Sequence, residues 1–150
     1  MSIYADTNFF SYLYLSDAGS GKAQALFQAE RPVLPVPWLL RLEVINALQQ
    51  AVFSGFGEGG ARISAEHAAA CQQHFRDDLR DGVAMRLADA PLHEIARHFE
   101  EIALRHTAKH GFRAYDILHV ASALALKCRT FWSFDKRASR LAKLEGLKTI

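Results

Sequence analysis

Residues 1–8 read MSIYADTN, and this stretch decides how the rest of the chain is interpreted. Residues 3–5 (IYA) form a short apolar run of the kind that builds a buried β-strand. Asp6 follows at once, and residues 9–15 (FFSYLYL) have a helical pattern for which Asn8 is the predicted N-cap. Ligands of open parallel α/β sheets bind just beyond the carboxyl ends of the strands. We therefore predict that Asp6 is the first ligand of a metal site.

The composition is that of an ordinary folded protein. The chain has 150 residues, of which half are hydrophobic and 23% charged, and its net charge is +2. These values exclude disordered and fibrous classes and predict one domain spanning residues 1–150. Cys71 and Cys128 lack metal-binding or redox spacing and predict reduced thiols in a cytoplasmic protein. Asp6 interrupts the apolar start that a signal peptide needs, and no run approaches the ~18 apolar residues of a membrane span.

Strand-like and helix-like segments alternate along the chain, which favours a parallel sheet covered by helices on both faces. Segments rich in turn-forming residues at 17–21 and 55–60 predict loops, the second of them flexible. The predicted strands cover residues 3–5, 33–36, 83–87, 130–134 and 147–150, and the predicted helices cover residues 9–15, 22–30, 38–53, 65–80, 91–110, 114–127 and 136–145.

Four acidic residues stand apart from the solvated charged faces that explain the others. Asp6 and Asp135 each follow a predicted strand, whereas Glu43 and Asp116 lie among apolar residues near the start of a predicted helix. A carboxylate on an apolar surface must pair with a cation, coordinate a metal or take up a proton. A single such acid is more often a buried ion pair than a ligand. All four positions can meet at one edge of a β/α sheet, so we expect them to form one site.

The chemistry of such a site follows from its charge. Ionised carboxylates repel one another, and a hard divalent cation such as Mg²⁺ or Mn²⁺ relieves the repulsion while keeping several bound waters. A bound water becomes a nucleophile, and the metal charge stabilises the transition state of phosphodiester cleavage. The acids therefore predict a metal-dependent enzyme that hydrolyses phosphodiester bonds.

The sequence resembles the PIN-domain nucleases over essentially its whole length, and most closely the VapC-type toxins of prokaryotic toxin–antitoxin pairs. The resemblance is carried by residues 6–8 (DTN), by Glu43, by residues 113–124 (RAYDILHVASAL) and by residues 133–135 (SFD). It implies a three-layer α/β/α sandwich with a central parallel sheet, and an endoribonuclease that depends on Mg²⁺ or Mn²⁺. Its implied catalytic and metal-binding residues are Asp6, Glu43, Asp116 and Asp135, and its implied supporting residues are Asn8, Ser133 and Arg113.

The same resemblance implies partners. They are an RNA substrate, an antitoxin protein that wraps the domain and reaches the site, and a second copy of the chain. The homodimer is also expected because the predicted helices 9–15 and 22–30 carry more apolar and aromatic residues than a domain of this size needs to bury. Residues 54–83 vary within the family, and their role stays open.

Several alternatives remain open at this stage. The chain could be a free-standing RNA-processing nuclease or a catalytically silent PIN-like scaffold. A phosphatase that forms an aspartyl-phosphate is less favoured, because that chemistry typically needs a second acid where Asn8 stands. His119 either packs in the core or assists the site. His106 and His110 lie four residues apart and could bind zinc, but they are not part of a known zinc motif, and a solvated helix end explains them more simply. A solvated face or an RNA-binding track explains Lys127, Arg129, Lys136, Arg137, Arg140 and Lys143.

Overall fold

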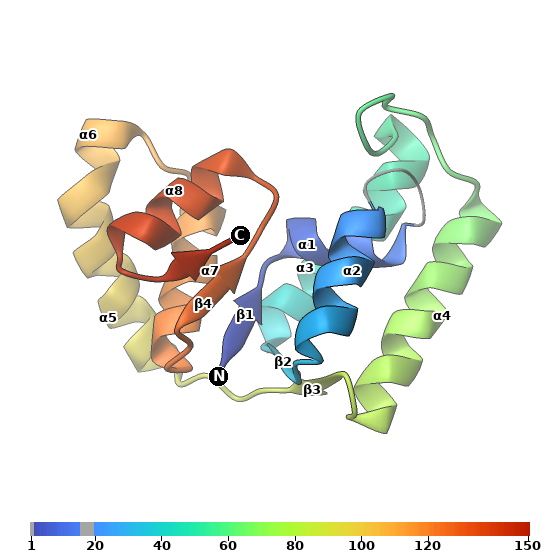
Figure 1. Ribbon diagram of the computed structural model, residues 1–150. Helices are drawn as coiled ribbons and strands as arrows, with labels where there is room; N and C mark the ends of the chain where they lie inside the picture. Colours follow the sequence, from blue (N-terminus) through green and yellow to red (C-terminus); the bar gives the residue numbers. More distant parts are fainter. Residues whose placement is uncertain (1, 16–19) are drawn as a thin grey trace.

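The computed structural model describes residues 2–15 and 20–150, and its five strands in these ranges all run parallel (Figure 1). β4 pairs with β1 on one side and with β5 on the other, and β2 pairs with β3 in a second ladder. Because β1 lies beside β2, the strands follow the order β3-β2-β1-β4-β5. The strands are β1 (Ile3–Ala5), β2 (Leu34–Val36), β3 (Met85–Leu87), β4 (Thr130–Trp132) and β5 (Lys148–Thr149).

Helices flank the strands on both faces, so the predicted three-layer α/β/α sandwich with a central parallel sheet is confirmed (Figure 1). The long helix predicted at 91–110 is present but contains a π-helical turn before Gly111 ends it with a φ of 69°. The helices are α1 (Thr7–Tyr14), α2 (Ser20–Glu30), α3 (Trp38–Ser54), α4 (Ala65–Asp81), α5 (Leu92–Ile102), the π segment η1 (Ala103–Thr107), α6 (Ala108–His110), α7 (Ala114–Ala125) and α8 (Lys136–Leu144).

The start of α1 differs from the prediction. Asn8 was expected to cap this helix, but Asp6 is its N-cap and accepts a hydrogen bond from the backbone N–H of Phe9 at 3.0 Å. Asn8 lies inside the helix, and its Oδ1 accepts the backbone N–H of Phe134 at 2.9 Å. Aspartate and asparagine cap helices equally well, so only the strand register, which places the end of β1, decides between them.

The two predicted loops have different outcomes. The loop predicted at 17–21 lies mostly outside the described residues, and residues 20–21 belong to α2. The segment 55–60, predicted to be flexible, is a closed turn in which Phe56 and Ala61 form an antiparallel bridge. Gly55 begins this turn with a φ of 84°, and a Cβ atom added to it would lie 1.9 Å from the backbone oxygen of Gly60. The turn therefore requires glycine at this position.

Gly55→Ala is expected to destabilise the protein by about 1–3 kcal/mol, because the alanine must adopt a strained φ and push the Gly60 carbonyl away. The free energy of unfolding in urea measures the effect. Gly59→Ala in the same turn is the matched control, since a Cβ there meets nothing within 4 Å and its φ is not in the left-handed region. Equal stability of the two variants would show that the turn is not closed.

Aromatic side chains fill the core around the first strand and helix. Tyr4 stacks on Phe131 of β4 with ring centroids 5.7 Å apart, and Phe9 packs against Trp132 with centroids 5.0 Å apart. Phe9 and Phe10 are fully buried, and the other large apolar residues of α1 and α2 are at least partly buried. None of the large apolar residues of these helices is therefore fully exposed, and β4 and α4 cover Phe9 and Phe10 respectively.

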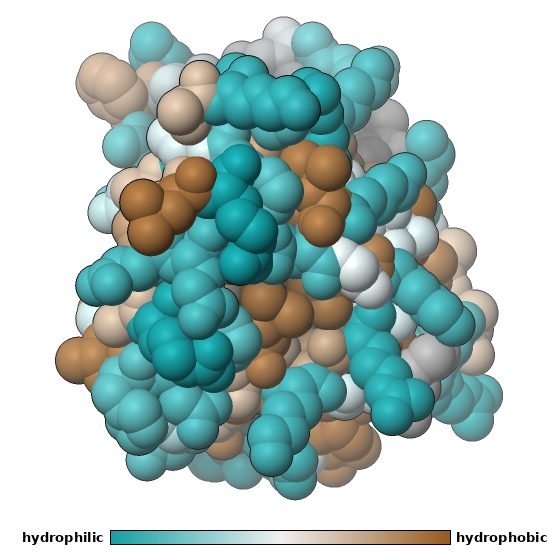
Figure 2. All heavy atoms as spheres, turned by 90° about the vertical axis from the view of Figure 1, so that its left-hand side faces the viewer, coloured by the Kyte–Doolittle hydropathy of each residue, from teal (hydrophilic) through white to brown (hydrophobic). Residues whose placement is uncertain are grey.

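The exposed apolar residues lie elsewhere. Hydrophilic side chains cover most of the face on the left of Figure 1, with apolar patches between them (Figure 2). Large exposed apolar side chains among the described residues include Trp38, Leu42 and Phe53 of α3 and Tyr115 of α7. No helix in the described ranges is long and apolar enough to cross a membrane.

Candidate active site

The parallel pairing of β1 with β4 builds the centre of the site. Ala5 is in register with Trp132, so Asp6 and Ser133 leave the ends of two neighbouring strands side by side. The backbone N–H of Asp6 donates to the Trp132 carbonyl at 3.1 Å, which continues the ladder by one residue. Because strand pairing and helix capping both hold Asp6, its carboxylate has a fixed place at the carboxyl edge of the sheet.

Asp6 is a costly charge in this position. Only 5% of its surface is exposed, and burial raises its pKa from 3.8 to about 6. His119, the Ser133 hydroxyl and the Phe9 N–H oppose that rise in pKa, whereas the neighbouring charge of Asp135 adds to it. The hydrogen bonds and charges around Asp6 therefore do not fully offset the cost of burying its ionised carboxylate, as expected of a carboxylate that binds a cation.

Glu43, on α3, lies at one end of a buried hydrogen-bond network. Thr7 Oγ1 donates to Glu43 Oε2 at 2.9 Å, and His119 Nε2 contacts the same carboxylate oxygen. The other ring nitrogen of His119, Nδ1, is 2.8 Å from the Tyr4 hydroxyl. With its proton on Nε2, His119 donates to Glu43 and accepts from Tyr4. Burial raises the pKa of Glu43, but these hydrogen bonds outweigh burial and lower it overall.

His119 packs in the core, and it also bonds to Glu43 through Nε2 and to Tyr4 through Nδ1. The roles of Tyr4 and Thr7 were not predicted, because Tyr4 reads as an ordinary strand residue and Thr7 as a turn residue. For His119 the sequence did contain a signal, because it lies three residues after Asp116 and both therefore share one face of α7. No such signal pointed to Tyr4 or Thr7.

Arg113 connects the two remaining acids. Asp116 lies in the first turn of α7, and its Oδ2 accepts a 3.4 Å contact from Arg113 Nε. Arg113 Nη2 is 4.0 Å from Asp135 Oδ2. Both contacts are long, and the Arg113 side chain is 62% exposed, so each ion pair contributes little to stability and is easily exchanged.

The predicted supporting residues hold the segment between β4 and α8. Ser133 Oγ accepts the backbone N–H of Asp135 at 3.0 Å, while Asn8 holds the backbone of Phe134 from the side of α1. Asp135 then caps α8, with its Oδ1 accepting the N–H groups of Arg137 and Ala138. One carboxylate oxygen of Asp135 therefore serves the helix, and the other faces Arg113.

The donor set fits a hard divalent cation, which prefers carboxylate oxygens. In the present arrangement, no three His, Cys, Asp or Glu side chains of the described residues are gathered closely enough to hold a metal ion. Their side chains have other partners instead: Glu43 bonds to Thr7 and His119, and Asp116 and Asp135 contact Arg113. Convergence of the acids on one ion therefore remains a prediction, and it requires the carboxylates to turn from these partners.

The zinc alternative at the end of the π segment and α6 receives no support. His106 Nε2 bonds to Glu145 Oε1 at 2.7 Å, and His110 Nδ1 is 3.2 Å from Arg140 Nη2. Their ring centroids are 6.2 Å apart. Each histidine therefore has a protein partner of its own on this surface.

The sequence as a whole matches a known domain family. The family model described as "PIN domain" matches residues 3–144, which includes every residue of the candidate site. The chain belongs to the PIN domain family. The predicted family resemblance is thus confirmed. The search of curated proteins found no match to this PIN domain.

Solved structures share the fold of this PIN domain at low sequence identity. The VapC20 toxin of Mycobacterium tuberculosis, described as cleaving the sarcin–ricin loop, has a TM-score of 0.64 and 20% identity, covering 93% of this chain and 94% of that one. VapBC2 of Rickettsia felis, bound to a promoter DNA fragment, has a TM-score of 0.64 and 13% identity, covering 100% and 98%. FitAcB of Neisseria gonorrhoeae has a TM-score of 0.61 and 14% identity, covering 99% and 96%.

Proposed function

We propose that this protein is an endoribonuclease that depends on Mg²⁺ or Mn²⁺ and hydrolyses RNA phosphodiester bonds in the cytoplasm. The observation that carries the proposal is Asp6, a buried carboxylate at the edge of a parallel sheet, whose pKa is raised by burial and by the neighbouring charge of Asp135. The similarity in fold to a toxin described as cleaving the sarcin–ricin loop supports the proposal.

Each residue of the site has a proposed part. Asp6, Glu43, Asp116 and Asp135 would hold the cation, which supplies an activated water and charge stabilisation when bound. Thr7 and His119 fix the orientation of Glu43, and Tyr4 fixes the orientation of His119. Arg113 is exposed and weakly paired, so its guanidinium is free to turn to an RNA phosphate.

The test of this function is cleavage of RNA by the purified chain. We expect cleavage with Mg²⁺ or Mn²⁺ present and none after the metal is removed with EDTA. Cleavage that continues in EDTA would contradict a metal-dependent mechanism, and binding without cleavage would favour a silent scaffold.

We further propose that the protein is the toxin of a type II toxin–antitoxin pair and that it forms a homodimer. VapBC2 of Rickettsia felis, whose structure holds a fragment of promoter DNA, shares the fold and supports this pairing. The exposed apolar side chains of α3 and α7 offer surface for such partners. A mass near 16.8 kDa in light scattering would identify a monomer instead.

A groove leads along α3 to the candidate site and suits an antitoxin peptide. Its volume is about 600 Å³, and its lining includes Thr7, Ser11, Leu42, Glu43 and Tyr115. Leu42 and Tyr115 are more than half exposed and give it apolar walls. We propose that an extended segment of the antitoxin lies here and places an Arg or Lys against the acids, since a guanidinium can bind two carboxylate oxygens at once.

Binding of the antitoxin is expected to weaken as Mg²⁺ rises, because the cation and the basic side chain compete for the same carboxylate oxygens. Titration of the co-expressed neighbouring protein at low and high Mg²⁺ measures this, with KCl at equal ionic strength as the control for screening. If the neighbour does not bind, or if its binding leaves RNA cleavage unchanged, the toxin assignment is wrong and a free-standing RNA-processing nuclease is the better interpretation.

A further inference from the structure

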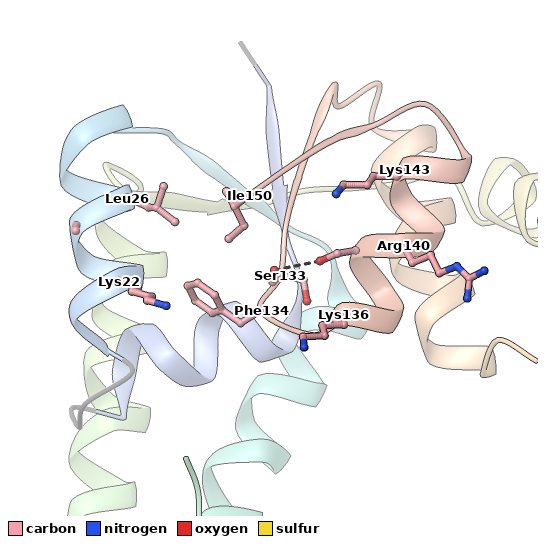
Figure 3. Close-up of a pocket in the computed structure, with 10 residues that line it drawn as sticks. Lys22, Leu26, Ser133, Phe134, Lys136, Arg140, Lys143 and Ile150 are labelled. Atoms are coloured by element: carbon pink, nitrogen blue, oxygen red, sulfur yellow. Dashed lines mark hydrogen bonds between the residues drawn. The ribbon is translucent and has the colours of Figure 1, made fainter. Parts of the chain in front are cut away.

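A second pocket opens between α2 and α8, beside the segment that connects β4 to α8 (Figure 3). Its volume is about 780 Å³. Lys22 and Leu26 of α2 line one side, and Lys143 of α8 lies across from them. Phe134 lies between the two helices, with Ile150 above it in the view.

The charged side chains that line this pocket are all basic. Its lining includes Lys22, Lys136, Arg140 and Lys143 but no acidic residue. None of the three lysines forms an ion pair with a residue in the described ranges, whereas the guanidinium of Arg140 turns outward to His110. The pocket therefore suits an anion and lacks the carboxylates that a metal ion would need.

The pocket adjoins the acidic site through a shared segment. Ser133 lines the pocket, yet its hydroxyl accepts the backbone N–H of Asp135 and lowers the pKa of Asp6. Lys136, the next residue after Asp135, is part of the pocket lining. A strand held at the acids can therefore continue into the basic pocket without crossing the body of the protein.

The pocket also has an apolar wall. Phe134 is only partly buried, and its ring packs against Phe9 at 5.6 Å and Tyr12 at 5.1 Å between centroids, so these rings hold it in place. Together with Leu26 and Ile150 it forms a surface beside the lysines. Cations for phosphates next to a fixed aromatic face for a base are the two elements of single-stranded nucleic-acid binding.

We propose that this pocket binds a nucleotide of the RNA strand next to the phosphodiester that is cut, with Lys22 and Lys143 each on one of the two phosphates that flank it and Phe134 against its base. The inference rests on the proposed function, since it takes RNA as the substrate. An acidic peptide would use the lysines as well, but an anionic polymer with flat bases uses both the cations and the aromatic wall. Phosphate contacts carry no sequence information, so the pocket positions the strand without selecting its sequence.

The test measures RNA binding without cleavage. A fluorescein-labelled single-stranded RNA of mixed sequence is titrated, with fluorescence anisotropy as the readout, against Asp116→Asn protein and against the same protein carrying Lys22→Gln and Lys143→Gln. We expect the double lysine change to weaken binding about tenfold, and to reduce the slope of log K against log salt by about 1.4, because each phosphate contact to a single strand contributes about 0.7.

The matched control removes the same charge elsewhere. Lys109 and Lys148 are both exposed, and neither lines the pocket, so replacing both with Gln is expected to leave the salt slope unchanged.

A third variant, Phe134→Leu, is expected to weaken binding several-fold with an unchanged salt slope, because it removes stacking and no charge.

The proposal is overturned if the Lys22 and Lys143 variant binds RNA like its parent, or if the Lys109 and Lys148 control loses as much affinity. It is also overturned if poly-glutamate displaces the RNA as well as unlabelled RNA does, which would assign the pocket to an acidic peptide. Unchanged binding by Phe134→Leu would overturn the contact with the base. These outcomes are separate from failure of the nuclease function, which is seen only as absent cleavage by the unmodified chain with Mg²⁺.

Discussion

Replacing Asp6 or Asp116 with Asn is expected to lower the rate of RNA cleavage by more than about a hundredfold, because changes around metal ligands alone cost up to that factor. Either change removes a negative charge and leaves an amide, which is a poor ligand for Mg²⁺. The fold should survive, since Asn at position 6 can still accept the Phe9 N–H that caps α1. Cleavage of a labelled RNA under single-turnover conditions measures the effect.

Two further variants make this result specific. Asp135→Asn should cost less, because one of its oxygens already serves as the cap of α8 and its side chain is 37% exposed. Asp77→Asn is the matched control, since Asp77 lies on the surface of α4 in an exposed pair with Arg80. If both the Asp6 and the Asp116 variants cut RNA at the parent rate, the assignment of the site is wrong.

Asp6→Asn is also expected to stabilise the metal-free protein by up to about 3 kcal/mol at pH 7, because each unit of pKa shift is worth about 1.4 kcal/mol and the pKa of Asp6 is raised from 3.8 to about 6. The folded state holds the Asp6 proton more tightly than the unfolded state does. The stability of the parent therefore falls as pH rises from about 4 to about 6, and then stays at the lower level.

Urea unfolding in EDTA, at several values of pH between 4 and 7, tests this expectation. The difference in unfolding free energy between Asp6→Asn and the parent should be small at pH 4 and grow through the window to pH 6. Mg²⁺ should then stabilise the parent more than the variant, because the cation supplies the charge that Asp6 lacks. A difference that is constant with pH would show that Asp6 does not titrate in this range.

The sequence determined the order of the elements and indicated the residues of the candidate site. A short apolar run followed by an acid is a local pattern, and it correctly placed Asp6 directly after β1. The strand predicted over residues 130–134 ends at Trp132, so Asp135 caps α8 and does not follow β4 directly. The acids in apolar surroundings, Glu43 and Asp116, were recognisable because a buried charge needs a partner wherever it lies. The family followed from these residues and their order.

Element ends and side-chain partners were not determined locally. Asp and Asn cap helices equally well, so the sequence alone could not distinguish Asp6 from Asn8, and Asn8 was predicted as the cap of α1. The register of β1 against β4 places the end of the strand and thereby makes Asp6 the cap. Phe9 and Phe10 of α1 were counted among a surplus of apolar residues because the strand and the helix that cover them lie far away in the chain.

The partners of the acids depend on contacts over long sequence separations. His119 bonds to Glu43 and to Tyr4, which lies 115 residues away. Lys22 and Lys143 line opposite sides of a pocket that no sequence motif indicates. Parallel strands joined by helices bring such distant residues together at one edge of the sheet. Burial at that edge, and the resulting rise in the pKa of Asp6, exist only once the surrounding elements have packed, so only the tertiary structure could decide them.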